Sequence, residues 1–535
     1  MMKAGGVFLS LLIMGCSAEE TDFSASSAAL TVSVEQGLVE GIQSPFKHSS
    51  GLPVTVFRGL PYAQPPVADL RWRPPVAPAS WQGTRTADTF ANSCYQPQHT
   101  STFVWRREAF AVSEDCLYLN IWTADTTKKQ PVMVWFHGGA HTSGQGHSLI
   151  FDGTELAGQG VVLITINYRL GPFGFLAHPL LAGDSNHGSA GNYGLLDKIA
   201  ALQWIRSNAE AFGGDPTNVT IFGQSAGSQS VCALMASPLA RDLFHKAIGQ
   251  SAACVNTIPT QDMDGYERGT KLVNALEANT LGALRGASPK SILAASELTH
   301  WADESRITVD GWVLPELPAN TFRAGRQAPV PLLLGFLADE GVELFPVDAA
   351  LTEDELNNFL SVLGGEDAQE LKGLYAIPGA TPGDVQHAVA TDYFMAFGMR
   401  RWAEYQQAID QPTFLYFMNH IPPAFHLYMP EPPELSLPGG PRSGGAYHSG
   451  DLALVFGNTD KVGFDWTDVD RKVSQNMMRY WINFAVSGNP NGDRVPLWPA
   501  FDGAVQNTQV LNDAPMTVQG VRRRQLDIMA TPKSS

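Results

Sequence analysis

Charge is scarce in this sequence, and most of what is present is acidic. Asp, Glu, Lys and Arg make up 16% of the 535 residues and hydrophobic residues 44%, so the chain has enough apolar surface for a sizeable core and too little charge for a disordered protein. There are 35 Lys and Arg residues against 52 Asp and Glu residues, which gives a formal net charge of −17. This is the wrong sign for binding a phosphate backbone, and we expect no nucleic-acid partner.

Long apolar runs are also lacking. Beyond the N-terminus no segment reaches about 18 uninterrupted apolar residues, the length that a membrane-spanning helix needs. The apolar stretch at residues 6–15 follows Lys3 and is itself too short to cross a bilayer, so we interpret residues 1–15 as an export signal. The small and polar composition of residues 16–30 predicts a flexible tether.

Residues 12–17 (LIMGCS) resemble a bacterial lipobox, with a small residue directly before a cysteine. The resemblance implies cleavage before Cys16 and acylation of its thiol, which would make the protein a cell-envelope lipoprotein. The alternative is an ordinary signal peptide cleaved a few residues later, which would give a periplasmic or secreted protein. A membrane contact is expected only through the lipid.

Cysteine is rare, with five residues in the whole chain. If Cys16 is lipidated, Cys94, Cys116, Cys232 and Cys254 remain, an even number in an oxidising compartment. Four cysteines allow three pairings, and the arithmetic does not choose between them. Pairing of neighbours would close two loops of about 22 residues, each stabilising by on the order of 3 kcal/mol. For Cys232 and Cys254, two buried thiols are an equally good interpretation.

Short apolar segments alternate with helical patterns along the middle of the chain. The predicted strands are residues 132–136, 161–166, 219–222 and 330–337. They are apolar almost throughout, as strands buried on both faces of a parallel sheet are. Helical spacing between Tyr193 and Phe212, and again over residues 228–235, predicts helices between the strands. This order predicts an α/β fold with a doubly wound sheet. No linker that would separate domains is found, so residues 31–535 are expected to form a single domain.

A candidate nucleophile lies between a predicted strand and a predicted helix. Residues 223–227 read GQSAG, a GxSxG pattern that is weak by itself and stronger in this setting, which a nucleophile elbow requires. The turn would present the Ser225 hydroxyl at a helix N-terminus. Because a serine hydroxyl is a poor nucleophile until a base takes its proton, a histidine and an acid must follow.

Chain order limits the choice of base and acid, because in such sheets the acid and then the histidine follow the serine. Six histidines come after Ser225: His245, His300, His387, His420, His426 and His448. His448 is favoured, since the small residues of its loop (444–450) leave room for an imidazole to reach the site. His245 is expected on the surface of a helical run, residues 241–248.

The acid and the oxyanion donors are predicted at the ends of strands. Asp339 and Glu340 both follow the strand that ends near Leu337, and the residues alone do not separate them. Residues 136–140 (FHGGA) follow another strand and offer backbone N–H groups. A Gly-Gly pair alone indicates a turn, but beside a nucleophile elbow it predicts an oxyanion hole, completed by the N–H of Ala226.

Several ordered stretches resemble the type-B carboxylesterase family of α/β-hydrolases, which includes cholinesterases, some lipases and bacterial esterases. The matching stretches are residues 57–63 (FRGLPYA), 113–120 (SEDCLYLN), 167–171 (NYRLG), 191–197 (GNYGLLD), 483–485 (NFA) and 488–490 (GNP). The resemblance covers nearly all of residues 31–535. It implies an α/β-hydrolase fold, with a mostly parallel central sheet flanked by helices and large helical and loop insertions around the active site.

The family pattern also implies roles for individual residues. It implies Ser225 as nucleophile, Glu340 as the acid, His448 as the base, Gly139, Ala140 and Ala226 as the oxyanion hole, and a disulfide between Cys94 and Cys116. The implied activity is cleavage of small carboxylic esters to an acid and an alcohol through an acyl-enzyme. Lipase, thioesterase or amidase activity on the same triad is the alternative, and a non-catalytic binding member is disfavoured because all three residues are present. No HExxH pattern and no GxGxxG after a strand occurs, so no metal or cofactor is expected.

Two positions, Gln224 and Trp105, differ from the family or lie beside one of its features. The family usually has Glu before the nucleophile, where this chain has Gln224. A neutral amide there should leave His448 easier to deprotonate than a carboxylate would. Trp105 lies within one residue of the position where cholinesterases carry an aromatic platform for quaternary ammonium. Because the alignment of this loop is loose, ordinary packing is the favoured interpretation of Trp105.

Overall fold

The computed structural model describes residues 30–98, 103–106, 110–255, 265–303, 306–428, 435 and 437–530. The predicted export signal, Cys16 and residues 17–29 of the predicted tether lie outside the described residues. No helix in the described part of the chain combines the length and the apolar character that crossing a membrane requires.

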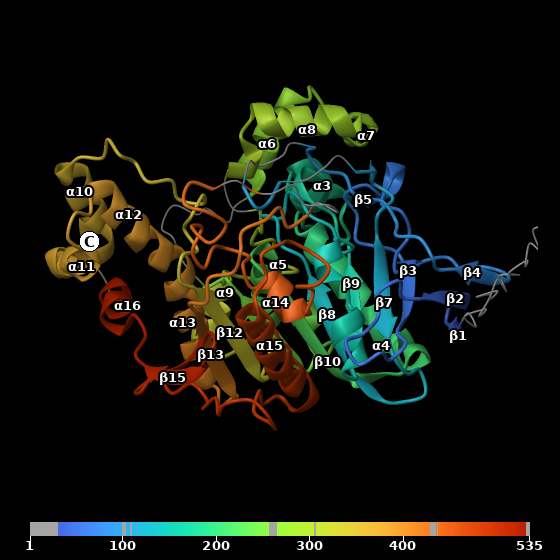
Figure 1. The fold of residues 1–535 in the computed structure, drawn as a ribbon. Coiled ribbons are helices and arrows are strands. Elements are labelled where there is room, and N and C mark those ends of the chain that lie inside the picture. Colours follow the sequence, from blue (N-terminus) through green and yellow to red (C-terminus); the bar gives the residue numbers. More distant parts are fainter. Residues whose placement is uncertain are drawn as a thin grey trace, which may run out of the picture.

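A large mixed sheet runs through the molecule (Figure 1). Its strands are β1 (Leu30–Val34), β2 (Gly37–Gln43), β3 (Thr55–Pro61), β4 (Thr84–Thr86), β7 (Tyr118–Thr123), β8 (Gln130–Phe136), β9 (Val162–Ile166), β10 (Gly214–Gln224), β11 (Lys246–Gln250), β12 (Leu332–Leu337), β13 (Thr413–Met418), β14 (Asn507–Leu511) and β15 (Met516–Gln519). The spatial order is β1-β2-β3-β7-β9-β8-β10-β11-β12-β13-β14-β15, with β4 beside β2. The centre, from β9 to β14, is parallel. At the edges β15 pairs antiparallel with β14, and β1, β2, β3 and β7 pair antiparallel in a row that ends on β9, while β4 lies parallel to β2.

Helices cover both faces of this sheet. They are α1 (Thr154–Gly158), α2 (Gly171–Phe175), α3 (Pro179–Asp184), α4 (Tyr193–Asn208), α5 (Ala226–Ala236), α6 (Gly265–Ala275), α7 (Leu281–Gly286), α8 (Pro289–Leu298), α9 (Pro318–Arg323), α10 (Glu353–Gly364), α11 (Ala368–Tyr375), α12 (Pro382–Thr391), α13 (Phe397–Gln407), α14 (Leu452–Phe456), α15 (Asp468–Ser487) and α16 (Arg523–Ala530). Two groups, α6–α8 and α10–α12, stand apart from the sheet as helical insertions (Figure 1).

Alternation along the strands divides the core between the two faces. On β8, Val132 and Val134 point into the core that includes the apolar side chains of α4 and α5. Met133 and Trp135 point into a second core, which includes those of α14 and α15. A central strand must therefore be apolar at every position, which is why the strands were recognisable from composition.

The predicted strands correspond to β8, β9, β10 and β12, although the prediction starts one residue before β9 and two residues before β12. The predicted helices correspond to α4, with the short turn after it, and to α5, so the expected α/β-hydrolase fold is confirmed. The prediction of one element was wrong. Residues 241–248 were expected to be helical, but they form a turn that leads into β11. The parallel partners β10 and β12 supply backbone hydrogen bonds there, and this pairing overrides the local pattern. His245 is half-buried, and its Nδ1 accepts from the N–H of Val219 at 3.1 Å.

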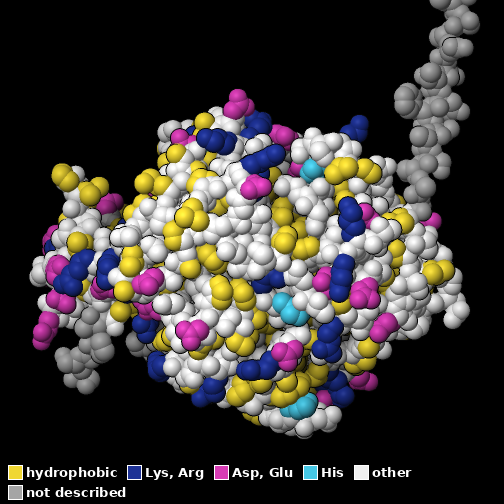
Figure 2. Space-filling view, turned by 90° about the horizontal axis from the view of Figure 1, so that it is seen from below, with side chains coloured by type: hydrophobic (Ala, Val, Ile, Leu, Met, Phe, Trp, Pro, Cys, Tyr) yellow, Lys and Arg dark blue, Asp and Glu magenta, His cyan; other side chains and the backbone are white. Residues whose placement is uncertain are grey.

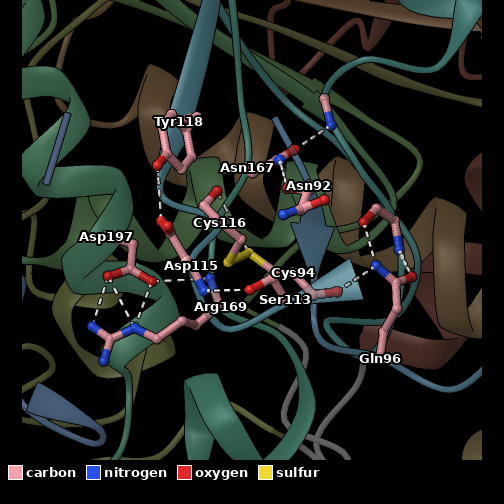
Figure 3. Close-up of a disulfide and its surroundings, with 12 residues drawn as sticks. Asn92, Cys94, Gln96, Ser113, Asp115, Cys116, Tyr118, Asn167, Arg169 and Asp197 are labelled. Atoms are coloured by element: carbon pink, nitrogen blue, oxygen red, sulfur yellow. Dashed lines mark hydrogen bonds and ion pairs between the residues drawn. A yellow bond between two sulfur atoms is a disulfide. The ribbon is translucent and has the colours of Figure 1, made fainter. Parts of the chain in front are cut away.

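Two disulfides join neighbouring cysteines. Cys94 bonds Cys116 and Cys232 bonds Cys254, each across 22 residues, so the alternative of two buried thiols at the second pair is excluded. A further two-stranded ladder, β5 (Ser93–Cys94) with β6 (Val112–Ser113), brings the first pair together. Figure 3 shows this bond among polar side chains, which include the ion pair of Arg169 with Asp197. The face in Figure 2 carries Lys and Arg side chains interspersed with Asp and Glu.

Candidate active site

Ser225 lies on a sharp turn between β10 and α5. Its backbone has φ +57° and ψ −126°, a strained conformation for a residue with a side chain. The turn is closely packed, since a Cβ on Gly227 would lie 1.9 Å from the carbonyl oxygen of Phe136, and one on Gly223 would lie 2.5 Å from the backbone of Gly227. Both glycines are thus required by the close approach of the backbones, as the pattern predicts.

His448 and Glu340 come together from segments that are 108 residues apart. The Nδ1–H of His448 donates to Oε2 of Glu340 at 2.6 Å, and both side chains are buried. The other carboxylate oxygen of Glu340 accepts from the N–H of Leu337 at 2.8 Å. The carboxylate is therefore fixed at both oxygens, one by the N–H of Leu337 and the other by the imidazole of His448.

Asp339, the neighbour that the residues alone did not separate from Glu340, contacts the backbone instead. Its Oδ2 accepts from the N–H of Ala446 at 2.7 Å, and its own N–H donates to the carbonyl of Ala446 at 3.1 Å. The two adjacent acids thus contact different parts of the loop that carries His448. Glu340 holds the imidazole of His448, and Asp339 holds the loop that carries it.

Three of the other histidine candidates have structural partners outside this site. His245 bonds the backbone of Val219, and His387 Nδ1 donates to the carbonyl of Phe345 at 2.5 Å. His420 Nε2 donates to Asp470 at 2.6 Å.

The Nε2 atom of His448 faces the turn that carries Ser225. The side-chain amide of Gln224 donates to it at 3.1 Å, and among the described residues no hydrogen bond joins the Ser225 hydroxyl to the imidazole. The ring of Trp105 meets the ring of His448 edge-on at 6.0 Å, and its indole N–H donates to Ser449 Oγ at 3.2 Å. Trp105 therefore packs against His448 at the site.

The loop after β8 turns back on itself at the predicted oxyanion residues. Gly139 has φ +106° and Ala140 φ +53°, and a Cβ on Gly139 would lie 2.2 Å from the carbonyl oxygen of Ser143. The Gly139 carbonyl accepts from the N–H groups of Thr142 and Ser143, each at 3.0 Å. Within the described part of the chain, the N–H groups of Gly139, Ala140 and Ala226 form no hydrogen bond. They are thus available donors.

One cavity of about 250 Å³ connects these features. Its lining residues are Trp105, Gly139, Ala140, Thr142, Ser143, Gln224, Ser225, Leu344, Tyr428, His448 and Ser449. A hydroxyl, an imidazole and backbone donors thus share one small space. No group of three His, Cys, Asp or Glu side chains suited to a metal occurs in the described ranges.

Comparison with known proteins decides the family. The sequence model of the Carboxylesterase family matches residues 28–529. The chain belongs to the carboxylesterase family.

Among its relatives are a fumonisin B1 esterase from Sphingopyxis macrogoltabida and a para-nitrobenzyl esterase from Bacillus subtilis. The first is 34% identical over 486 residues, which cover 88% of this chain and 84% of that protein; the second is 33% identical over 503 residues, covering 91% and 96%. A solved PNB esterase structure superposes with a TM-score of 0.78 at 30% identity, over 94% of this chain and 99% of that one. The protein is a carboxylic ester hydrolase.

This carboxylesterase carries a further acid, Asp451, behind its proposed site. Asp451 is buried and accepts from Gln250 Nε2 at 2.8 Å and from the hydroxyl of Tyr416 at 3.3 Å. Burial raises the pKa of Asp451 to about 6, and the nearby Glu340 carboxylate acts in the same direction. Only the fold shows that Asp451 is buried, because its position three residues after His448 does not indicate burial.

Proposed function

We propose that this carboxylesterase cleaves its esters through a covalent acyl-enzyme on Ser225, with His448 as general base and Glu340 as the acid that orients it. The observation that carries the proposal is the hydrogen bond of 2.6 Å from His448 to Glu340, in a cavity lined by both His448 and Ser225. This bond fixes the tautomer that leaves Nε2 able to accept a proton.

In the first step His448 Nε2 takes the hydroxyl proton as Ser225 Oγ attacks the ester carbonyl carbon. In the free protein the amide of Gln224 occupies Nε2, so the Ser225 hydroxyl must replace it when substrate binds. Negative charge develops on the former carbonyl oxygen, and the N–H groups of Gly139, Ala140 and Ala226 are its proposed donors. A single donor of this kind typically contributes about 10²- to 10³-fold to the rate.

The tetrahedral intermediate collapses as the bond to the alcohol breaks, and His448 returns its proton to the departing oxygen. Water then enters in place of the alcohol, and His448 takes its proton during attack on the acyl-enzyme. Breaking the bond to Ser225 Oγ releases the carboxylic acid, and the serine regains its proton. Glu340 stabilises the imidazolium that forms in each half-reaction.

The cavity favours small neutral esters with an aromatic or short aliphatic part. Trp105, Leu344 and Tyr428 supply apolar surface, and among the described lining residues there is no Lys, Arg, Asp or Glu. An anionic acyl group would lose its hydration there without a cationic partner. The name of the Bacillus subtilis relative, para-nitrobenzyl esterase, points to the same class.

The direct test is Ser225→Ala, assayed with nitrophenyl acetate and butyrate. Removal of the nucleophile should lower kcat at least about 10³-fold, and a variant that retains full activity would refute the assignment. On the wild type, a neutral p-nitrobenzyl ester should exceed the matching succinate half-ester in kcat/KM by at least about 10-fold. Equal kcat/KM values for the two esters would contradict the inference that the uncharged cavity lining favours neutral esters.

Lipase, thioesterase and amidase activity use the same proposed machinery and differ in the bond that is cleaved. Matched ester, amide, thioester and long-chain substrates of one acyl group separate them in a competition assay. The proposal predicts the highest kcat/KM for the short ester, and a higher value for any other member overturns the substrate class.

We also propose that the protein is exported as a lipoprotein and acts as a single catalytic domain of residues 31–535. Two disulfides support an oxidising compartment. Cys16→Ala should abolish incorporation of labelled palmitate and release the enzyme from the membrane fraction of a bacterial host. Labelling retained in Cys16→Ala would indicate a different acylated residue, and absence of labelling in the wild type would indicate ordinary signal cleavage.

A further inference from the structure

His141 is a buried polar residue that the proposed mechanism does not use. It follows directly on Gly139 and Ala140 and is 2% exposed, yet it is absent from the cavity lining. Its ring packs against Phe175 at 5.0 Å, and its Nε2 lies 3.0 Å from Oε1 of Gln229. A side-chain hydrogen bond therefore joins the loop of the proposed oxyanion donors to helix α5.

The backbone at this point needs such support. Ala140 has φ +53° and His141 has φ +57°, so two successive residues with side chains adopt the left-handed conformation. Each such residue is unfavourable and persists only where surrounding contacts enforce it. The carbonyl of His141 accepts from the N–H of Gly171 at 2.7 Å, which fixes its backbone, and Gln229 fixes its side chain.

Gln229 is itself tied to the nucleophile turn. It lies one helical turn beyond Ser225, and its N–H donates to the Ser225 carbonyl at 2.9 Å. The same helix begins at Ala226, whose N–H is a proposed oxyanion donor. The bond from His141 to Gln229 thus runs between the two pieces of backbone that supply the donors.

The far end of the loop is held by other neutral side chains. Gln96 exchanges two hydrogen bonds with the backbone of Gly144, at 2.8 and 2.9 Å, and Asn167 accepts from Gly146 at 2.8 Å (Figure 3). These contacts fix the loop to the β5 and β9 side of the molecule. None of them reaches α5, so they do not set the distance between the Gly139 and Ala226 amides.

His141 is suited to a permanent contact. Burial lowers the pKa of its imidazole well below the usual value, and the nearby Lys198, Arg306 and His137 act in the same direction. The ring is therefore neutral, with Nε2–H donating to Gln229. The contact is expected to persist across the pH range in which the enzyme works.

We propose that His141 and Gln229 are positioning residues, which align the N–H groups of Gly139 and Ala140 with that of Ala226 on the oxyanion of the transition state. The inference rests on the proposed oxyanion hole. His141 acts through the backbone and touches no reacting atom. A shift of a few tenths of an ångström in the loop would weaken the bonds to the oxyanion more than those to the ground-state ester.

The test compares His141→Phe, Gln229→Leu and the double variant. Phenylalanine keeps the packing on Phe175 and removes the donor. Each single variant should lower kcat/KM for nitrophenyl butyrate about 10-fold, mainly through kcat, with KM within about twofold. Affinity for a trifluoromethyl ketone, which forms the tetrahedral adduct, should fall by the same factor. The double variant should lose no more than either single one.

Two further variants separate positioning from general stability. His141→Gln retains an N–H donor and should recover most of the activity. His48→Phe alters another buried histidine, 7% exposed and outside the site, and should lower the thermal stability without lowering kcat. If His141→Phe lowers Tm but leaves the inhibitor affinity unchanged, the role is only structural and the inference fails. Failure of the proposed function itself would be seen in the wild type, as absence of fluorophosphonate labelling at Ser225.

Discussion

The surroundings of Ser225 differ on its two sides: ionisable side chains lie on one side and backbone amides on the other. On one side lie the ionisable side chains of the proposed proton transfer, with His448 2.6 Å from Glu340 and the buried Asp451 nearby. On the other side, the proposed oxyanion donors are backbone amides, held by neutral side chains such as His141 and Gln229. Proton transfer needs groups that change charge, whereas oxyanion binding needs donors whose charge and position stay constant. Substitutions on the first side should therefore alter pH profiles, and those on the second should alter rates uniformly across pH.

The largest effect in this comparison is expected for Glu340→Gln, which should lower kcat by about 10³- to 10⁴-fold. The amide cannot accept from both His448 and the N–H of Leu337 with the same pair of atoms, so the imidazole loses its fixed tautomer. Steady-state hydrolysis of nitrophenyl butyrate measures it. Asp339→Asn is the matched control, because an amide oxygen can still accept from Ala446, and its kcat should stay within a few-fold of wild type. Equal losses in the two variants would contradict the division between the adjacent acids.

On the oxyanion side, Gly139→Ala should lower kcat about 10²- to 10³-fold. The new Cβ would lie 2.2 Å from the carbonyl oxygen of Ser143, in a residue at φ +106°, and the loop must shift to accommodate it. The decrease should be the same at every pH. Gly160→Ala has a comparable φ of +93° with no atom near its Cβ, so it reports the backbone strain alone. An equal decrease of kcat in Gly160→Ala would contradict the proposed role of the Gly139 loop in binding the oxyanion.

A smaller effect, confined to pH, is expected for Gln224→Glu. A carboxylate 3.1 Å from Nε2 would stabilise the imidazolium of His448, so the acid limb of the kcat/KM profile should move about one pH unit higher than in the wild type. Gln224→Met, which is neutral, should leave the limb in place. Superimposable limbs for the glutamate variant and the wild type would rule out the interpretation of Gln224 as the feature that leaves His448 easier to deprotonate.

The smallest effect is on stability. The pKa of Asp451 is raised to about 6, so between about pH 4 and 6 the folded state holds a proton that the unfolded state releases, and the wild type loses stability as pH rises through this window. Asp451→Asn removes this dependence, and its free energy of unfolding should gain on the wild type by up to about 3 kcal/mol from pH 4 to 7.

Denaturant unfolding at each pH measures that difference. Asp384→Asn is the control with the opposite sign, because hydrogen bonds from Thr381 lower the pKa of Asp384. The free energy of unfolding of this variant should fall relative to the wild type as pH rises. A difference between the Asp451 variant and the wild type that does not change with pH would contradict burial of an ionisable acid at this position.

The features that the sequence predicted are those that local pattern encodes. The central strands were recognisable because each is apolar on both faces, and the turn at Ser225 because two glycines are needed there within five residues. The family and its fold are confirmed, while the catalytic roles of the site residues stay predictions for the experiments above. Strand β11 was missed because its conformation depends on strands that lie elsewhere in the chain.

Features that depend on side-chain direction could not be predicted from the residue types alone. Asp339 and Glu340 are adjacent acids that only the family resemblance distinguished, and the fold shows that Glu340 faces His448 and Asp339 the backbone. Cysteine spacing left three pairings open for the same reason. The contact of His141 with Gln229 joins a loop to helix α5 between residues that are 88 positions apart, and neither residue has a pattern that indicates the other.

The most direct test of the central claim is mass-spectrometric mapping of the adduct formed with a fluorophosphonate. The account predicts one phosphonyl group per chain, on the peptide that contains Ser225, formed more slowly in Glu340→Gln and absent in Ser225→Ala. An adduct on a different residue, or an unlabelled wild type that still hydrolyses nitrophenyl esters, would contradict it.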